Sequence, residues 1–98
     1  MSRYAYPAIF EPEAEGGYSV HFPDLQGCYT CGDTLADAIY VAEDVLAFTL
    51  FGFERENTTP PAPSEHLTAP AGSFVNWILG NTIWYRKREE CRRRKEAK

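Results

Sequence analysis

The apolar residues of this chain change their spacing at Thr34, and this change limits what the chain can fold into. Before Thr34, apolar and polar residues alternate, as in a strand with one covered face. After Thr34, apolar residues recur every three or four positions for about twenty residues, as in a helix. A chain of 98 residues with 44% apolar side chains has room for one core. The sequence therefore predicts a single α+β domain in which a helix packs on one small sheet.

Three short strands are predicted in the first third of the chain. Alternation over residues 4–10 and 17–22 predicts the first two strands, and residues 28–32 form a shorter third one. Pro7 restricts the first strand to a sheet edge, or to a position whose backbone N–H is not needed by a neighbour. Turns rich in glycine, proline and acidic residues separate the three strands.

The helix is predicted over residues 35–54, because Thr34 and the acid at Asp37 have the spacing of a helix N-cap. One stripe is expected to pack on the sheet: Leu35, Ala38, Ile39, Ala42, Leu46, Thr49, Leu50 and Phe53. The opposite face places Phe48 and Phe51 among charged residues. Such an apolar patch is typical of an association site. The alternative is that the proline-rich segment or the last helix folds back over it.

The remainder of the chain completes the order β-β-β-α-β-α. Residues 55–72 hold four of the seven prolines and predict a long extended connection within the domain. Residues 73–79 predict a fourth strand with both faces covered, as in an inner strand. Ile83–Glu96 has a helical pattern that ends strongly basic. We therefore expect a domain over residues 1–85 and a basic helical tail over residues 86–98.

Charge is divided unevenly between these two parts. Residues 1–85 have two basic and eleven acidic side chains, a net charge of −9, whereas residues 86–98 have eight basic and three acidic ones, a net charge of +5. The acidic body repels nucleic acid and favours a basic protein partner. Only the tail is suited to contact phosphates, and the favoured alternative is a solvated helix end, where cations interact well with the helix dipole.

Location and redox state follow from what the sequence does not contain. It has no run of eighteen apolar residues and no stretch that reads as a signal peptide. We therefore expect a cytoplasmic protein that does not enter a membrane. Three cysteines in such a chain are expected to be reduced thiols.

Catalytic patterns are absent from the sequence. Cys28 and Cys31 have the spacing of a redox or zinc pair, but an offset of three on a strand places the two thiols on opposite faces. Further ligands are scattered over three elements: His21, His66 and Cys91. The carboxylates fall mostly in turns and at the helix start, where capping explains them, and no glycine-rich phosphate loop precedes a helix. The sequence therefore predicts a binding protein without cofactor or metal, not an enzyme.

Several short motifs follow one another in a fixed order: Tyr6-Pro7, the acidic turn Glu13-Ala14-Glu15-Gly16-Gly17-Tyr18, Phe22-Pro23-Asp24-Leu25 with Gly27-Cys28, Gly32-Asp33-Thr34-Leu35, Gly72-Ser73-Phe74-Val75, and Tyr85-Arg86. Together they resemble the N-terminal domain of the HicB antitoxin family. The resemblance spans nearly the whole chain. It implies a partly degraded RNase H-like fold that has lost the nuclease carboxylates.

The resemblance also implies a role in a type II toxin–antitoxin pair. In such a pair the chain would bind and mask a HicA-like toxin, a small basic mRNA interferase. The acidic body suits a basic partner because complementary charge steers encounter. Many members of the family carry a C-terminal DNA-binding domain, and this sequence reaches Lys98 without room for one, so we expect the short form. The alternative is a free-standing oligomeric module of the HicB fold with no toxin partner.

Two partner-binding surfaces are predicted. Acidic residues in the turns and at the helix start are expected to contact basic residues of the toxin: Glu13, Glu15, Asp24 and Asp33. Residues of the outer helix face are expected to supply an apolar contact to toxin or to a second copy: Tyr40, Val41, Phe48 and Phe51. We expect the protein to form a homo-oligomer.

Overall fold

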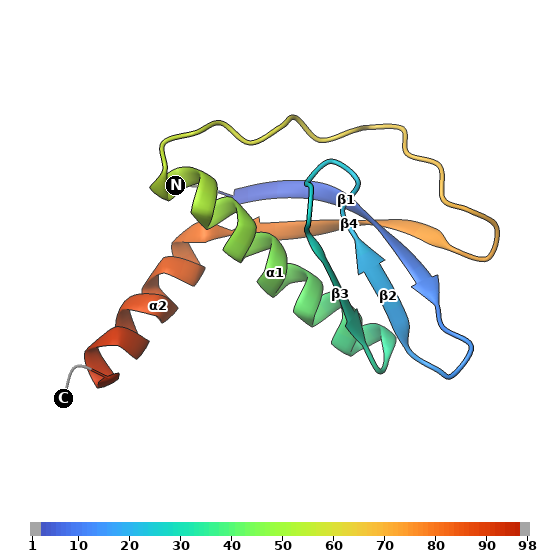
Figure 1. Ribbon diagram of the computed structural model, residues 1–98, viewed down its shortest axis with the longest axis horizontal. Helices are drawn as coiled ribbons and strands as arrows, with labels where there is room; N and C mark the ends of the chain where they lie inside the picture. The colour runs from blue at the N-terminus through green and yellow to red at the C-terminus, as the bar shows by residue number, and fades with distance from the viewer. Residues whose placement is uncertain (1–2, 97–98) are drawn as a thin grey trace.

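The computed structural model describes residues 3–96, with the side chains of 84, 88, 89 and 93–96 excluded. Its elements are β1 (Arg3–Pro12), β2 (Tyr18–His21), β3 (Tyr29–Gly32), α1 (Leu35–Arg55), β4 (Phe74–Asn81) and α2 (Thr82–Glu96). The strands form one antiparallel sheet in the order β3-β2-β1-β4. Helix α1 lies across one face of this sheet, and α2 extends away from its end (Figure 1). The predicted α+β class and order of elements are confirmed.

The central strand β1 accommodates a proline because of its register. Residues 3–10 of β1 pair with β4, with Pro7 opposite Trp77. The ladder between β1 and β2 begins only at Ile9. On the side away from β4, Pro7 therefore lies beyond the end of β2, and a missing N–H on that side costs no hydrogen bond between strands. Of the two placements predicted for Pro7, the sheet edge is therefore not the observed one, and a position whose N–H is not needed by a neighbour is.

The prediction that the fourth strand is an inner strand is wrong, since β4 lies at an edge of the sheet. Its apolar residues on both faces suggested cover on both sides. Ile78 is buried under α1, but Trp77 and Leu79 point to the opposite face and are 47% and 67% exposed. Apolar residues on a strand show where cover is favourable, and they do not show whether the same chain supplies it.

Helix α1 begins and packs largely as its sequence predicts. The backbone N–H of Asp37 donates a hydrogen bond to the Thr34 hydroxyl, 3.1 Å away, which confirms the N-cap. Four of the five buried side chains of α1 lie on the predicted stripe, namely Ala38, Ala42, Leu46 and Leu50, whereas the fifth, Ala47, was not predicted. Leu35 is the exception and is 41% exposed, because it lies in the first turn at the end of the sheet. The core therefore occupies a single layer between α1 and the sheet.

The proline-rich segment that follows α1 is an extended connection held at two points. The Tyr6 hydroxyl donates a hydrogen bond to the carbonyl of Pro61. The carboxylate of Asp24 accepts hydrogen bonds from the backbone N–H and the hydroxyl of Ser64, at 2.8 and 2.6 Å. These contacts tie the segment to the body of the domain on its way to β4 (Figure 1).

Candidate partner-binding surfaces

Two turns that are separate in sequence lie side by side at one end of the sheet. Tyr18, at the start of β2, pairs with Gly32, at the end of β3. Gly17 approaches so closely that a Cβ there would lie 2.7 Å from the Gly32 carbonyl oxygen, and its φ of +84° also favours glycine. The β1–β2 turn, which carries Glu13 and Glu15, therefore lies next to the β3–α1 junction.

The same end of the molecule gathers exposed carboxylates, which we call the acidic end: Glu13, Glu15, Asp33 and Asp37. Glu13 accepts a hydrogen bond from the Ser19 hydroxyl. The basic side chains that the structure describes belong to other regions, namely the first residue of β1, the last turn of α1, and α2. The acidic end is thus a solvated surface of one sign of charge, next to the N-terminus of α1.

Asp24 does not belong to this surface. It lies in the β2–β3 turn, at the other end of β2 from the acidic turn. Its two carboxylate oxygens accept the hydrogen bonds from Ser64 described above. The structure therefore gives Asp24 a role within the chain, as an anchor for the proline-rich segment, and separates it from the other predicted acidic contacts.

The outer face of α1 is partly covered by α2. The ring of Tyr85, which is buried, lies 5.4 Å from that of Phe51 and 6.1 Å from that of Phe48. The guanidinium of Arg86 lies 4.8 Å from the centre of the Phe51 ring, within cation–π range. Phe51 is half-buried as a result, so the alternative that the last helix folds over the patch holds for this residue.

The remaining part of that face stays open. Phe48 is 60% exposed despite its contact with Tyr85, and Tyr40, two turns earlier on α1, is 61% exposed. Val41 is half-buried. An exposed apolar surface therefore remains on α1, smaller than the sequence predicted and centred on Tyr40 and Phe48.

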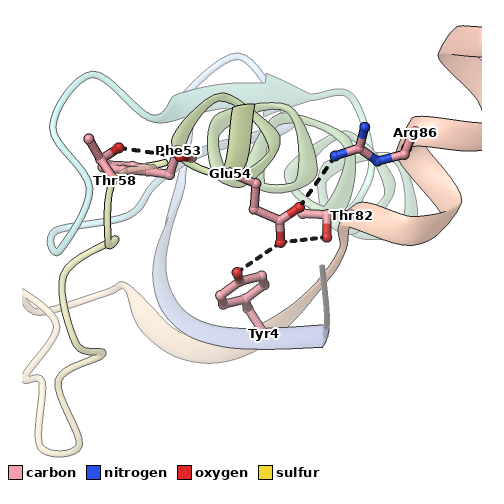
Figure 2. A network of polar contacts seen from close by, with 6 residues as sticks. All are labelled: Tyr4, Phe53, Glu54, Thr58, Thr82 and Arg86. Atoms are coloured by element: carbon pink, nitrogen blue, oxygen red, sulfur yellow. Dashed lines mark hydrogen bonds and ion pairs between the residues drawn. The ribbon is translucent and has the colours of Figure 1, made fainter. Parts of the chain in front are cut away.

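A carboxylate that sequence reasoning missed links α2 to the rest of the domain. Glu54, in the last turn of α1, accepts hydrogen bonds from the hydroxyls of Tyr4 and Thr82, each 2.9 Å away, and lies 4.0 Å from the Arg86 guanidinium (Figure 2). Burial raises the pKa of Glu54, but hydrogen bonds from Tyr4 and Thr82, together with further favourable interactions of the carboxylate, bring the pKa below its ordinary value. One feature of the sequence could have pointed to Glu54. It is an acid at the C-terminal end of a helix, where the helix dipole disfavours a negative charge.

The thiols do not form a paired site. Cys28 is buried, and its sulfur accepts a hydrogen bond from the Thr49 hydroxyl, 3.4 Å away, whereas Cys31 is exposed. Burial raises the pKa of the Cys28 thiol, and the hydrogen bond from Thr49 only partly offsets this. The two cysteines thus point apart, as the strand period predicts. Among the described residues, no three His, Cys, Asp or Glu side chains gather in a way that could hold a metal ion.

No helix in the described part of the chain is both long and apolar enough to cross a bilayer.

Comparisons with known proteins agree with the fold. A chain of a structure described as a toxin–antitoxin complex from Streptococcus pneumoniae superposes with a TM-score of 0.74 at 20% identity, covering 85% of this chain and 72% of that one. A chain of a HicA3 and HicB3 toxin–antitoxin complex superposes with a TM-score of 0.58 at 24% identity, covering 76% of this chain and 95% of that one. At such identities the likeness shows the fold alone.

Sequence comparison places the chain in a family. "Antitoxin HicB 1" of Photorhabdus laumondii subsp. laumondii is 42% identical over 60 residues, which are 59% of this chain and 39% of that protein. The chain therefore matches well under half of the length of that relative. The model of a family described as the HicB-like antitoxin of bacterial toxin–antitoxin systems matches residues 6–80. Since that match covers most of the chain, the protein belongs to the HicB-like antitoxin family.

Proposed function

We propose that this chain is an antitoxin that binds and masks a small, basic, HicA-like ribonuclease, and that it performs no catalysis itself. The observation that carries the proposal is the exposed acidic end in a member of this antitoxin family. A ribonuclease must present cations to the phosphates of its substrate, and a surface of carboxylates competes for the same cations. Masking then requires only that the bound antitoxin excludes RNA.

The proposal gives two surfaces of the chain different roles in toxin binding. The acidic end steers encounter with the basic toxin, because complementary charge raises the association rate more than it raises the final affinity. The open apolar face around Tyr40 and Phe48 then supplies desolvated contact area at the centre of the interface. Val41 and Phe51 are half-buried and offer less apolar surface to a partner. Asp24, held by Ser64, contributes little to toxin binding.

The test is co-purification with the product of an adjacent reading frame that encodes a small basic protein, followed by RNA cleavage with and without this chain. Reversing charge in the double variant Glu15→Lys, Asp33→Lys is expected to lower the association rate by at least about tenfold. The matched control is Glu56→Lys, Glu65→Lys, which makes the same charge change at two exposed positions away from the acidic end. It is expected to lower the rate by no more than about threefold.

Two outcomes would contradict the proposal. An equal effect of both double variants would show that net charge, and not the acidic end, governs association. A basic neighbour that cleaves RNA undisturbed would favour the other function considered, a free-standing oligomeric module with no toxin.

We place this function in the cytoplasm, where an mRNA interferase meets its substrate. Contact of the basic tail with nucleic acid stays a prediction. It requires an affinity that falls steeply with salt and that is lost when residues 86–98 are removed.

A further inference from the structure

A cavity of about 520 Å³ lies between the proline-rich segment, the β2–β3 turn and α1. The segment leaves the end of α1 and passes this turn (Figure 1), where its contacts with Tyr6 and Asp24 hold it in place. A cavity of this volume is typical of a site for a small ligand. All three parts of the chain contribute to its lining: Asp24 and Leu25 from the turn, Thr49 and Phe53 from α1, and Thr59 and Pro61 from the segment.

One wall of the cavity is apolar. Leu25 belongs to the core and is 3% exposed, and Phe53 is half-buried against the same core. An aliphatic stem placed against these two side chains gains free energy by leaving water. A fully polar ligand, such as a metal ion or an inorganic anion, would leave this wall unused.

The polar groups of the cavity are mainly acceptors of hydrogen bonds. The Thr49 hydroxyl donates its proton to the sulfur of Cys28, so only its oxygen lone pairs remain. Each carboxylate oxygen of Asp24 accepts one hydrogen bond from Ser64 and can accept a second. Pro61 has no backbone N–H to offer. A ligand that fits this balance supplies donors.

The charge of the cavity is negative. Asp24 lines it, and none of the described lining residues is lysine, arginine or histidine. The basic helix α2 does not change this, because it packs on the outer face of α1, with Arg86 over the ring of Phe51. Phe53 belongs instead to the stripe of α1 that packs on the core. The ligand is therefore expected to be a cation.

We propose that this cavity binds a small organic cation, an alkylamine or an alkylguanidine. The charged head lies at Asp24 and donates hydrogen bonds to its carboxylate, and the stem lies against Leu25 and Phe53. Hydrogen bonds between ionised partners are stronger than neutral ones, and a guanidinium matches a carboxylate in shape. The inference does not rest on the toxin, because Asp24 and the acidic end lie at opposite ends of β2.

The test is a titration of the protein with butylguanidinium, followed by the NMR shifts of its backbone amides. The amides of Leu25, Thr49 and Thr59 are expected to shift and to saturate together. Butylurea is the matched ligand control, since it keeps the shape and the stem but carries no charge. Its dissociation constant is expected to be at least about tenfold larger.

Three variants separate the charge of Asp24 from its role as an anchor. Asp24→Asn is expected to weaken binding at least about tenfold, because the carboxylate is lost. Asp33→Asn removes an exposed carboxylate of the acidic end and is expected to change the dissociation constant by no more than about threefold. Ser64→Ala loses the same hydroxyl–carboxylate bond to the segment but keeps the charge, so its binding is expected to stay within about threefold of wild type or to tighten.

Four results would overturn the proposal. Equal binding of butylurea and butylguanidinium would show that charge is not recognised. Shifts that do not saturate, or that centre on the acidic end, would indicate general attraction of a cation to an acidic protein. Equal losses in Asp24→Asn and Ser64→Ala would mean that the position of the segment, and not the carboxylate, matters. Displacement of butylguanidinium by a co-purified toxin would assign the cavity to a basic side chain of that partner, not to a free ligand.

Discussion

One carboxylate, Glu54, links α2 to both β1 and α1. Glu54 is only 11% exposed, and the two hydroxyls that donate to it come from β1 and from the first residue of α2. Thr82 is fully buried, so its hydroxyl needs this acceptor. Arg86 is partly exposed and 4.0 Å away, so its ion pair adds less than the hydrogen bonds do. The polar part of the attachment of α2 therefore depends more on these partly buried hydrogen bonds than on the ion pair, and the ring contacts of Tyr85 add an apolar part.

Glu54→Gln is expected to lower the free energy of unfolding at pH 7 by about 1–2 kcal/mol, because hydrogen bonds to a charged acceptor become bonds to a neutral one. The folded-state pKa of Glu54 lies below its ordinary value of 4.5. Its contribution is therefore fully present above pH 4.5 and is lost as pH falls through the folded pKa. Urea unfolding across this range should show the gap between wild type and Glu54→Gln closing at low pH.

Glu56→Gln is the control for loss of one negative charge, because Glu56 is exposed just after α1. A gap between wild type and Glu54→Gln that stayed constant from pH 7 to pH 3 would show that the charge of Glu54 does not stabilise the fold.

Residue-level roles were predictable only where the partner is close in sequence. The Thr34 cap follows from a spacing of three residues and is confirmed. Asp24 has the same chemistry, but its partner Ser64 is 40 residues away, and no local pattern connects a turn aspartate to a serine in a distant proline-rich segment. Glu54 was missed for the same reason, since Tyr4 is 50 residues away.

The contact between the end of β3 and the start of α1 shows how tightly two elements are joined. A Cβ on Gly32 would lie 2.5 Å from the backbone nitrogen of Ala38, so Gly32→Ala forces the helix and strand apart. We expect a loss of about 1–3 kcal/mol in the free energy of unfolding. Gly52→Ala is the matched control, because a Cβ there meets nothing within 4 Å and the site lies inside α1. It should stabilise the protein by about 0.5–1 kcal/mol.

Thermal or urea unfolding of the two alanine variants measures both effects. Similar values for Gly32→Ala and Gly52→Ala would show that the β3–α1 junction yields easily and does not fix the position of the helix.

The elements themselves were largely predictable, whereas their neighbours in the sheet were not. Period two and period 3.6 are local properties, so strands and the α1 helix could be placed from the sequence. Strand order depends on contacts between distant segments. For β4, apolar residues on both faces favoured an inner position, yet the strand lies at an edge with Trp77 and Leu79 uncovered. Apolar residues on both faces of a strand therefore did not show which strands lie beside it.

The acidic and basic segments of the chain also lie apart in the folded molecule. The acidic end lies at the start of α1, and α2 leaves from the opposite end of that helix (Figure 1). The net charges of the two segments could be predicted from the sequence. The gathering of Glu13 and Glu15 beside Asp33 could not, because it depends on the pairing of Tyr18 with Gly32. The acidic end and the basic helix α2 thus lie at opposite ends of α1.

The acidic end should make toxin binding sensitive to salt. Raising ionic strength from 50 to 500 mM shortens the screening length from about 14 to about 4 Å, so attraction between the acidic end and a basic toxin is largely screened. We expect the association rate with the toxin to fall at least about tenfold. Stopped-flow mixing over a series of ionic strengths measures this rate. An association rate that does not change with salt would mean that charge does not steer the encounter, and the acidic end would then not be the surface that guides the toxin to its site.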